Sequence, residues 1–104
     1  MNNNQLQQGD VWLEKVDRMP EKIKVIREDG ILAYGEKTGH KHQLEDTNIK
    51  IYESENHMFF VEVEKPVKLK HDEHKEILIN PGIWEFGQVR EKDWLNNMVR
   101  PVID

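Results

Sequence analysis

Cysteine is missing from this sequence of 104 residues, and serine occurs only once, as Ser54. The first absence excludes disulfides, thiolate metal sites, iron–sulfur clusters and cysteine nucleophiles. The second leaves one serine hydroxyl, and its surroundings lack the Gly-x-Ser-x-Gly pattern of a nucleophile elbow. The sequence therefore favours a binding protein over an enzyme, and any metal must be held by nitrogen and oxygen ligands.

Long hydrophobic runs and an excess of positive charge are also absent. No segment approaches the ~20 apolar residues that a membrane helix requires. Residues 1–8 lack the basic start and the apolar stretch of a signal peptide. The formal net charge of -5 would repel a nucleic-acid backbone. These features predict a cytoplasmic protein that binds neither a membrane nor an extended nucleic acid.

The sequence does contain enough apolar residues for one modest core. Hydrophobic residues make up 37% of the chain and charged residues 34%, a balance that is typical of a globular domain. Residues 1–8 are polar, with too little apolar content to order themselves. We therefore expect a flexible tail over residues 1–8 and a single domain over residues 9–104.

Short apolar runs alternate with turn signals from residue 9 onward, which is typical of an all-β domain. We predict a small barrel or barrel-like sandwich of roughly seven to nine short strands. Asp29-Gly30 is the strongest hairpin signal, and Glu55-Asn56 is a weaker one that leaves His57 exposed in its turn. Residues 93–97 are a candidate for one short helical turn. The expected strands cover residues 11–16, 23–27, 31–35, 40–44, 49–53, 58–63, 67–70, 76–79 and 83–90.

Side-chain parity places several histidines on the inner face of these strands. Residues two apart on a strand point to the same side of the sheet. His40 and His42 therefore share a face with Leu44, and the inner row of the strand over residues 67–70 continues to His71. Histidines from two separate strands are thus expected to meet at the core or at the mouth of a pocket.

The last predicted strand changes from apolar to polar along one face, which also indicates a pocket. Trp84 is in phase with Gln88 and Arg90, and Arg90 can hold an anionic group through a bidentate contact. Glu53 continues the inner row of its own strand. The sequence therefore predicts a pocket for a small ligand, lined by His40, His42, His71, Trp84, Gln88 and Arg90.

A metal site is the alternative use of the same histidines. Two histidines at positions i and i+2 of a strand, here His40 and His42, can chelate one cation from one face. Their imidazole ligands suit zinc, iron, manganese or nickel. His71 is the candidate third ligand and His74 a weaker fourth. Three nitrogen ligands with an open position would form a catalytic site, in which Glu53 or Glu73 acts as the base.

The segment 38–42, Thr-Gly-His-Lys-His, followed by Glu45 and by the Asn-Pro-Gly-Ile-Trp segment 80–84, resembles part of the cupin pattern. In cupins an HxH pair, a nearby glutamate and a later histidine bind a metal inside a β-barrel. Here no histidine follows His74. The resemblance therefore implies a third ligand from elsewhere in the chain, for which His71 is the best placed.

The chain also resembles small β proteins of phages and bacteria. They carry a TGHxH segment, a later HxEH segment, here residues 71–74, and a PGxY/W strand that ends in residues like Gln-x-Arg-Glu, here residues 88–91. The resemblance covers much of residues 9–104 and implies no particular activity. It fits a phage accessory protein that sequesters a nucleotide-like signal of host defence in the host cytoplasm. Such a protein can build its pocket across a homo-oligomer interface.

Three functions therefore stay open at the level of the sequence. The first is the binding of a small, nucleotide-like ligand. The second is a metal-dependent, cupin-like enzyme that uses His40, His42 and His71. The third is a protein-interaction module that uses an exposed β edge, in which case the histidines have no functional part.

Overall fold

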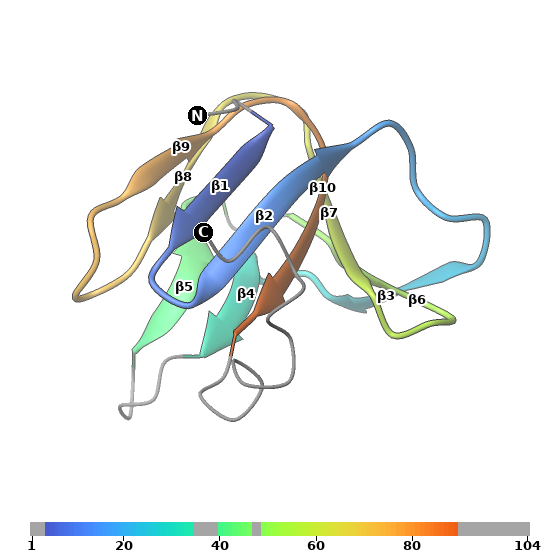
Figure 1. The fold of residues 1–104 in the computed structure, drawn as a ribbon, viewed down its shortest axis with the longest axis horizontal. Helices are drawn as coiled ribbons and strands as arrows, with labels where there is room; N and C mark the ends of the chain where they lie inside the picture. The colour runs from blue at the N-terminus through green and yellow to red at the C-terminus, as the bar shows by residue number, and fades with distance from the viewer. Residues whose placement is uncertain (1–3, 35–39, 47–48, 90–104) are drawn as a thin grey trace.

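The computed structural model describes residues 4–34, 40–46 and 49–89, and this part of the chain forms ten strands and no helix. The predicted all-β class is confirmed, as a barrel-like sandwich of two antiparallel sheets that do not close into a barrel (Figure 1). Arg90 and the candidate helical turn over 93–97 lie outside the described residues. The strands are β1 (Gln5–Gln8), β2 (Val11–Val16), β3 (Ile23–Arg27), β4 (Ile31–Tyr34), β5 (Lys41–Leu44), β6 (Ile51–Ser54), β7 (Phe59–Val63), β8 (Val67–Lys70), β9 (Ile77–Ile79) and β10 (Gly82–Gln88).

The chain passes repeatedly from one sheet to the other. Six strands form one sheet in the order β1-β2-β10-β7-β6-β3, and four form the other in the order β4-β5-β8-β9. The chain crosses between the sheets after β3, β5, β7 and β9. Apolar side chains of both inner faces meet between the sheets and exclude water, which is the main stabilising contribution to such a fold. This core contains Val11, Leu13, Leu32, Ala33, Leu44, Ile51, Val61, Val63, Val67, Leu69, Ile79, Trp84 and Phe86.

The Asp29-Gly30 hairpin prediction is wrong. The strand before it, β3, pairs with β6, whereas the strand after it, β4, pairs with β5 in the other sheet. The local turn is nevertheless present, because Asp29 Oδ1 accepts the Ile31 N–H at 3.0 Å and Gly30 has a φ of 73°. The Gly30 carbonyl accepts the Leu44 N–H at 2.8 Å. The pairing of β4 with β5, which is distant in the sequence, therefore determines the direction of the chain after this turn.

The Glu55-Asn56 hairpin prediction is confirmed. Strands β6 and β7 pair antiparallel, and the turn is closed by a 3.0 Å hydrogen bond from the His57 N–H to the Ser54 carbonyl. His57 ends the turn with a φ of 64°, the left-handed conformation that three-residue hairpin loops use at this position. Its side chain is exposed, as the sequence predicts.

The prediction of a flexible tail over residues 1–8 is wrong for residues 5–8. These residues form β1, which pairs with β2 through the two-residue turn Gly9-Asp10. Gly9 has a φ of 57°, as the first position of a type II′ turn requires. Leu6 packs against the core and Gln8 is 3% exposed. The additional strand explains why the described residues contain one strand more than the predicted maximum.

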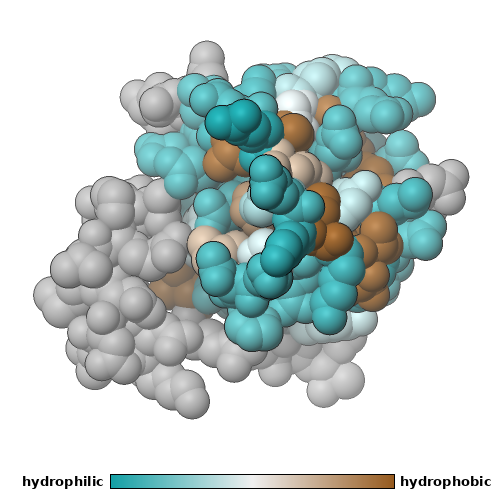
Figure 2. Space-filling model, turned by 90° about the vertical axis from the view of Figure 1, so that its right-hand side faces the viewer, coloured by the Kyte–Doolittle hydropathy of each residue, from teal (hydrophilic) through white to brown (hydrophobic). Residues whose placement is uncertain are grey.

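The face that carries β3 and β6 is mostly hydrophilic, with hydrophobic residues visible in patches between the polar ones (Figure 2). Val25 of β3 is 43% exposed. Apolar atoms contribute a large share of the surface of ordinary folded proteins, so these patches call for no partner. Within the described part of the chain, no helix is long and apolar enough to cross a membrane.

Candidate functional site

Four histidines from two separate segments converge beside the four-stranded sheet. We call them the histidine cluster: His40, His42, His71 and His74. His42 lies in β5 and His40 immediately precedes it, whereas His71 and His74 belong to the loop between β8 and β9. The ring centroids of His42 and His71 are 4.3 Å apart, and those of His71 and His74 are 4.5 Å apart. His40 meets His71 edge-on at 5.7 Å. Strand parity therefore predicted a real convergence in space.

His42 is the buried member of the cluster, and its two ring nitrogens are both engaged inside the protein. Its Nδ1 lies 2.8 Å from Gln8 Oε1, and its Nε2 lies 3.1 Å from Asp10 Oδ1. The Gln8 amide nitrogen donates to the carbonyls of Leu69, at 2.8 Å, and Lys75, at 3.0 Å. These two bonds fix the orientation of the amide, so Gln8 Oε1 accepts a hydrogen bond from the His42 Nδ1–H. His42 is therefore a buried structural residue that holds β5 against Gln8 and Asp10.

Gln88 extends this polar network across the sandwich. Its amide nitrogen donates to Asp10 Oδ2 at 2.8 Å and to the Tyr34 carbonyl at 2.9 Å. One chain of contacts thus joins β4, β10, the β1–β2 turn, β5 and the β8–β9 loop. Gln88 was expected to touch a ligand, and the structure places it behind Asp10.

Sequence reasoning missed Gln8 and Asp10. Gln8 lies in a polar stretch without an apolar period, and Asp10 resembles an ordinary turn residue. One signal was available, because Gln8 is two residues beyond Leu6 and therefore shares its face in an extended strand. Applied to residues 5–8, the parity argument would have placed this amide toward the core.

His71 is held in one tautomer by its own loop. Its Nδ1 accepts the Glu73 N–H at 3.0 Å, so the neutral ring carries its hydrogen on Nε2 and donates from there. Burial lowers the pKa of His71, and the neighbouring His74 and His40 lower it further, while Asp72 and Glu73 act in the opposite direction. His71 is therefore neutral near pH 7 and offers one N–H donor.

The pKa of His42 is also lowered, chiefly by burial and then by the adjacent His71. The carboxylate of Asp10 acts in the opposite direction, through its charge and through the hydrogen bond that it accepts from Nε2 when the ring is protonated. Protonation of either ring thus places positive charge in a crowded, partly dehydrated group of imidazoles.

The two remaining histidines contact the turn segments around them. His40 lies between two carboxylates, with its Nε2 3.7 Å from Asp72 Oδ2 and its Nδ1 3.5 Å from Glu73 Oε1. His74 lies directly over Gly9, where an added Cβ would come within 2.5 Å of His74 Nε2. Glycine at position 9 is therefore required both for the turn conformation and for the seating of His74.

Replacing Gly9 by alanine is expected to lower the free energy of unfolding by about 1–2 kcal/mol, because a side chain at positive φ is strained. The new Cβ also displaces His74 from its seat. Urea denaturation measures the loss, and the ring proton shifts of His74 report its movement. Unchanged His74 shifts would show that this ring does not depend on Gly9.

The predicted metal ligands do not form a ready-made metal site. Among residues 4–34, 40–46 and 49–89, no group of three or more His, Asp or Glu side chains is arranged to hold one ion. The tautomer of His71 explains part of this, because its Nε2 carries hydrogen. The rings of His42 and His74 stack nearly parallel, at 16°, so their in-plane lone pairs do not converge.

A cleft of about 450 Å³ lies beside the histidine cluster. Its walls include both loop histidines, two lysines of the four-stranded sheet and several carboxylates. Lys70 Nζ lies 3.2 Å from Glu45 Oε1, and both side chains are about half exposed. Residues that line the cleft include Lys41, Glu45, Lys70, His71, Asp72 and His74.

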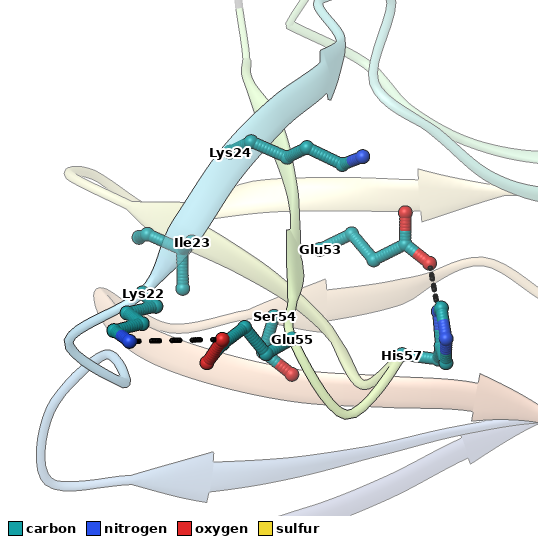
Figure 3. A pocket seen from close by; sticks show the side chains of 7 residues that line it. All are labelled: Lys22, Ile23, Lys24, Glu53, Ser54, Glu55 and His57. Carbon is teal, nitrogen blue, oxygen red and sulfur yellow. Dashed lines mark hydrogen bonds and ion pairs between the residues drawn. The ribbon is translucent and has the colours of Figure 1, made fainter.

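Two other predicted site residues lie away from this cleft. Trp84 is fully buried in the core, and its indole N–H donates to the Asn80 carbonyl at 2.9 Å. Glu53 accepts a hydrogen bond from His57 Nδ1 at 3.1 Å. That pair belongs to a second cleft of about 320 Å³, where Lys22 pairs with Glu55 (Figure 3). Figure 1 shows β3 and β6, which carry this second cleft, on the opposite side of the molecule from β5 and β8.

The fold and the site define an all-β sandwich whose two sheets are tied together by a buried glutamine–histidine–aspartate network beside a polar cleft. The chain belongs to the family described as "Domain of unknown function (DUF8820)", whose model matches residues 7–88. The match begins in β1 and ends with the last residue of β10, so it includes Gln8, Asp10, the histidine cluster and Gln88. No curated protein and no solved structure matches the chain.

Proposed function

We propose that this protein binds a small, phosphate-bearing, nucleotide-like ligand in the cleft beside the histidine cluster. The observation that supports this most directly is the set of donor side chains that line one cleft of about 450 Å³: Lys41, Lys70 and His71, whose neutral ring carries its hydrogen on Nε2. This volume is within the range of small-molecule pockets, roughly 300–1,000 Å³. Phosphate oxygens accept strong hydrogen bonds from such N–H donors.

The carboxylates of the cleft are compatible with this ligand. Glu45 pairs with Lys70 at the surface, and an exposed ion pair of this kind contributes only about 0–1 kcal/mol. A phosphate group can therefore displace Glu45 from Lys70 at little cost. Asp72 and Glu45 then offer acceptors to sugar hydroxyls or to base N–H groups, which favours a nucleotide-like ligand over a bare anion.

Sequestration is the simplest role for such a protein. Holding a ligand requires a complementary pocket and no nucleophile, which agrees with a chain that has no cysteine and one serine. A phage-encoded protein of this kind would withdraw a nucleotide signal of host defence from the host cytoplasm. A second copy of the chain can complete the pocket if the protein is a homo-oligomer.

Nucleotides are expected to raise the melting temperature of the full chain in a concentration-dependent manner, because they bind only the folded state. Lys70→Ala and His71→Ala should each weaken the affinity about tenfold, the equivalent of one charge-assisted hydrogen bond. Thermal shift with mono-, di- and cyclic nucleotides selects the probe, and calorimetry measures its affinity.

Lys24→Ala is the matched control, because Lys24 lines the second cleft on β3. It should leave the affinity unchanged. The proposal fails if no nucleotide stabilises the protein, or if Lys24→Ala weakens binding as much as Lys70→Ala. Metal analysis of protein purified without a histidine tag tests the enzyme alternative: stoichiometric metal that His40→Ala removes would favour that alternative.

A further inference from the structure

We propose that the cleft takes up one proton together with its anionic ligand, and that His71 is the group that accepts this proton. The inference rests on the proposed function, because it requires an anion in the cleft. It concerns the regulation of binding: acid strengthens the hold on the ligand, and a rise in pH releases it.

The hydrogen bond and the ring contacts of His71 disfavour a proton on this ring. Its Nδ1 already accepts the Glu73 N–H at 3.0 Å, so a proton at this atom must break that bond. A charged ring would also stand beside three other imidazoles, with centroids 4.3 Å, 4.5 Å and 5.7 Å away. A positive charge on His71 is therefore unfavourable in this crowded group of rings.

An anion in the cleft reverses this balance. It lies against the Nε2–H side of His71 and supplies the negative charge that a protonated ring requires. The proton enters at Nδ1, which changes from an acceptor to a donor and releases the Glu73 N–H. That amide can then donate to the anion, while the carboxylates of the same loop are acceptors for Nδ1–H.

The other charged groups around His71 come from several elements. The ring of His42 in β5 lies against it at a tilt of 38°, and Asp10 of the β1–β2 turn lies behind His42. His40 precedes β5 and is itself placed between Asp72 and Glu73. The cleft side adds His74, Lys41, Lys70, Glu45 and Glu76, and Glu76 is paired with Lys68. Among the described residues that line the cleft, His71 combines this position with an Nδ1 that accepts a backbone N–H and that protonation would release.

Linkage gives the size of the effect. We compare a protein with the anion bound, in which His71 is protonated, and a protein without the anion, in which His71 is neutral. Between these two states, the affinity for the anion rises about tenfold for each unit that the pH falls. The rise stops where the empty protein also takes up the proton.

Sulfate is the appropriate probe, because it remains a dianion from about pH 5.5 to about pH 8, whereas phosphate esters titrate in this range. Calorimetry of the full chain, in two buffers of different ionisation enthalpy, measures both the affinity and the protons taken up. We expect up to about one proton per sulfate and an affinity that rises about tenfold per pH unit.

Two glutamine variants complete the test. His71→Gln keeps an N–H donor but does not titrate, so it should bind sulfate with no proton uptake and no pH dependence. His57→Gln changes an exposed histidine of the other cleft and should keep the pH dependence of the wild type. A pH-independent affinity in the wild type, or an unchanged slope in His71→Gln, overturns the inference while the proposed function stands. Failure of sulfate and of every nucleotide to bind at any pH overturns both.

Discussion

Replacing Gln8 by alanine is expected to lower the free energy of unfolding by about 3 kcal/mol. The amide of Gln8 bonds three groups at once: the carbonyls of Leu69 and Lys75 and the ring of His42. Truncation leaves these partners unsatisfied in a region that is largely closed to water. Each buried group without a partner costs about 1–3 kcal/mol, and partial entry of water reduces the sum. Urea denaturation of the variant measures the loss.

Gln7→Ala is the matched control from the same polar stretch. The Gln7 side chain makes an exposed hydrogen bond to the Gly9 carbonyl, and its loss should change the stability by less than about 0.5 kcal/mol. Equal effects of the two substitutions would contradict the role of Gln8. They would also favour the flexible tail that the composition predicts for residues 5–8 over an ordered strand.

The strands that the sequence predicted best are those defined by their own alternation. The predicted bounds of β2, β3 and β8 agree with the structure, because apolar and polar residues alternate clearly or the runs end at turn residues. Strand β1 carries no such signal. Its order comes from pairing with β2 and from one buried amide, and neither appears in the composition of residues 1–8.

The site shows the same division between local and long-range information. Parity along β5 and β8 predicted that His42 and His71 meet, since each follows from its own strand. The groups that hold them could not be predicted in this way: Gln8 and Asp10 are 34 and 32 residues from His42, and Asp10 is 78 residues from Gln88. Contacts between residues so far apart in the sequence depend on the order of the strands in the sheets, which local patterns do not give. The Asp29-Gly30 hairpin prediction was wrong for the same reason, because β3 and β4 pair in different sheets.

Lowering the pH below about 6.5 is expected to destabilise the ligand-free protein through the histidine cluster. In the unfolded chain His42 titrates near its ordinary pKa of 6.5, whereas in the folded protein burial and then His71 lower its pKa. The unfolded state therefore binds more protons in this window. The stabilisation is complete above pH 6.5 and is lost as the pH falls through the folded pKa. Within the window, the unfolded chain binds up to one more proton at His42 than the folded protein does, and this difference sets the upper limit of the slope.

His71 contributes in the same direction, because its pKa is lowered as well, with a smaller share where solvent screens it. Urea denaturation between about pH 7.5 and about pH 5 measures the combined slope. His71→Gln should reduce the slope, whereas His57→Gln, which changes an exposed histidine outside the cluster, should preserve it. Equal slopes in the three proteins would exclude the cluster as the cause.

Sulfate should increase the free energy of unfolding more at pH 5.5 than at pH 7.5, because the bound anion compensates the charge of protonated His71. This difference should be absent in His71→Gln.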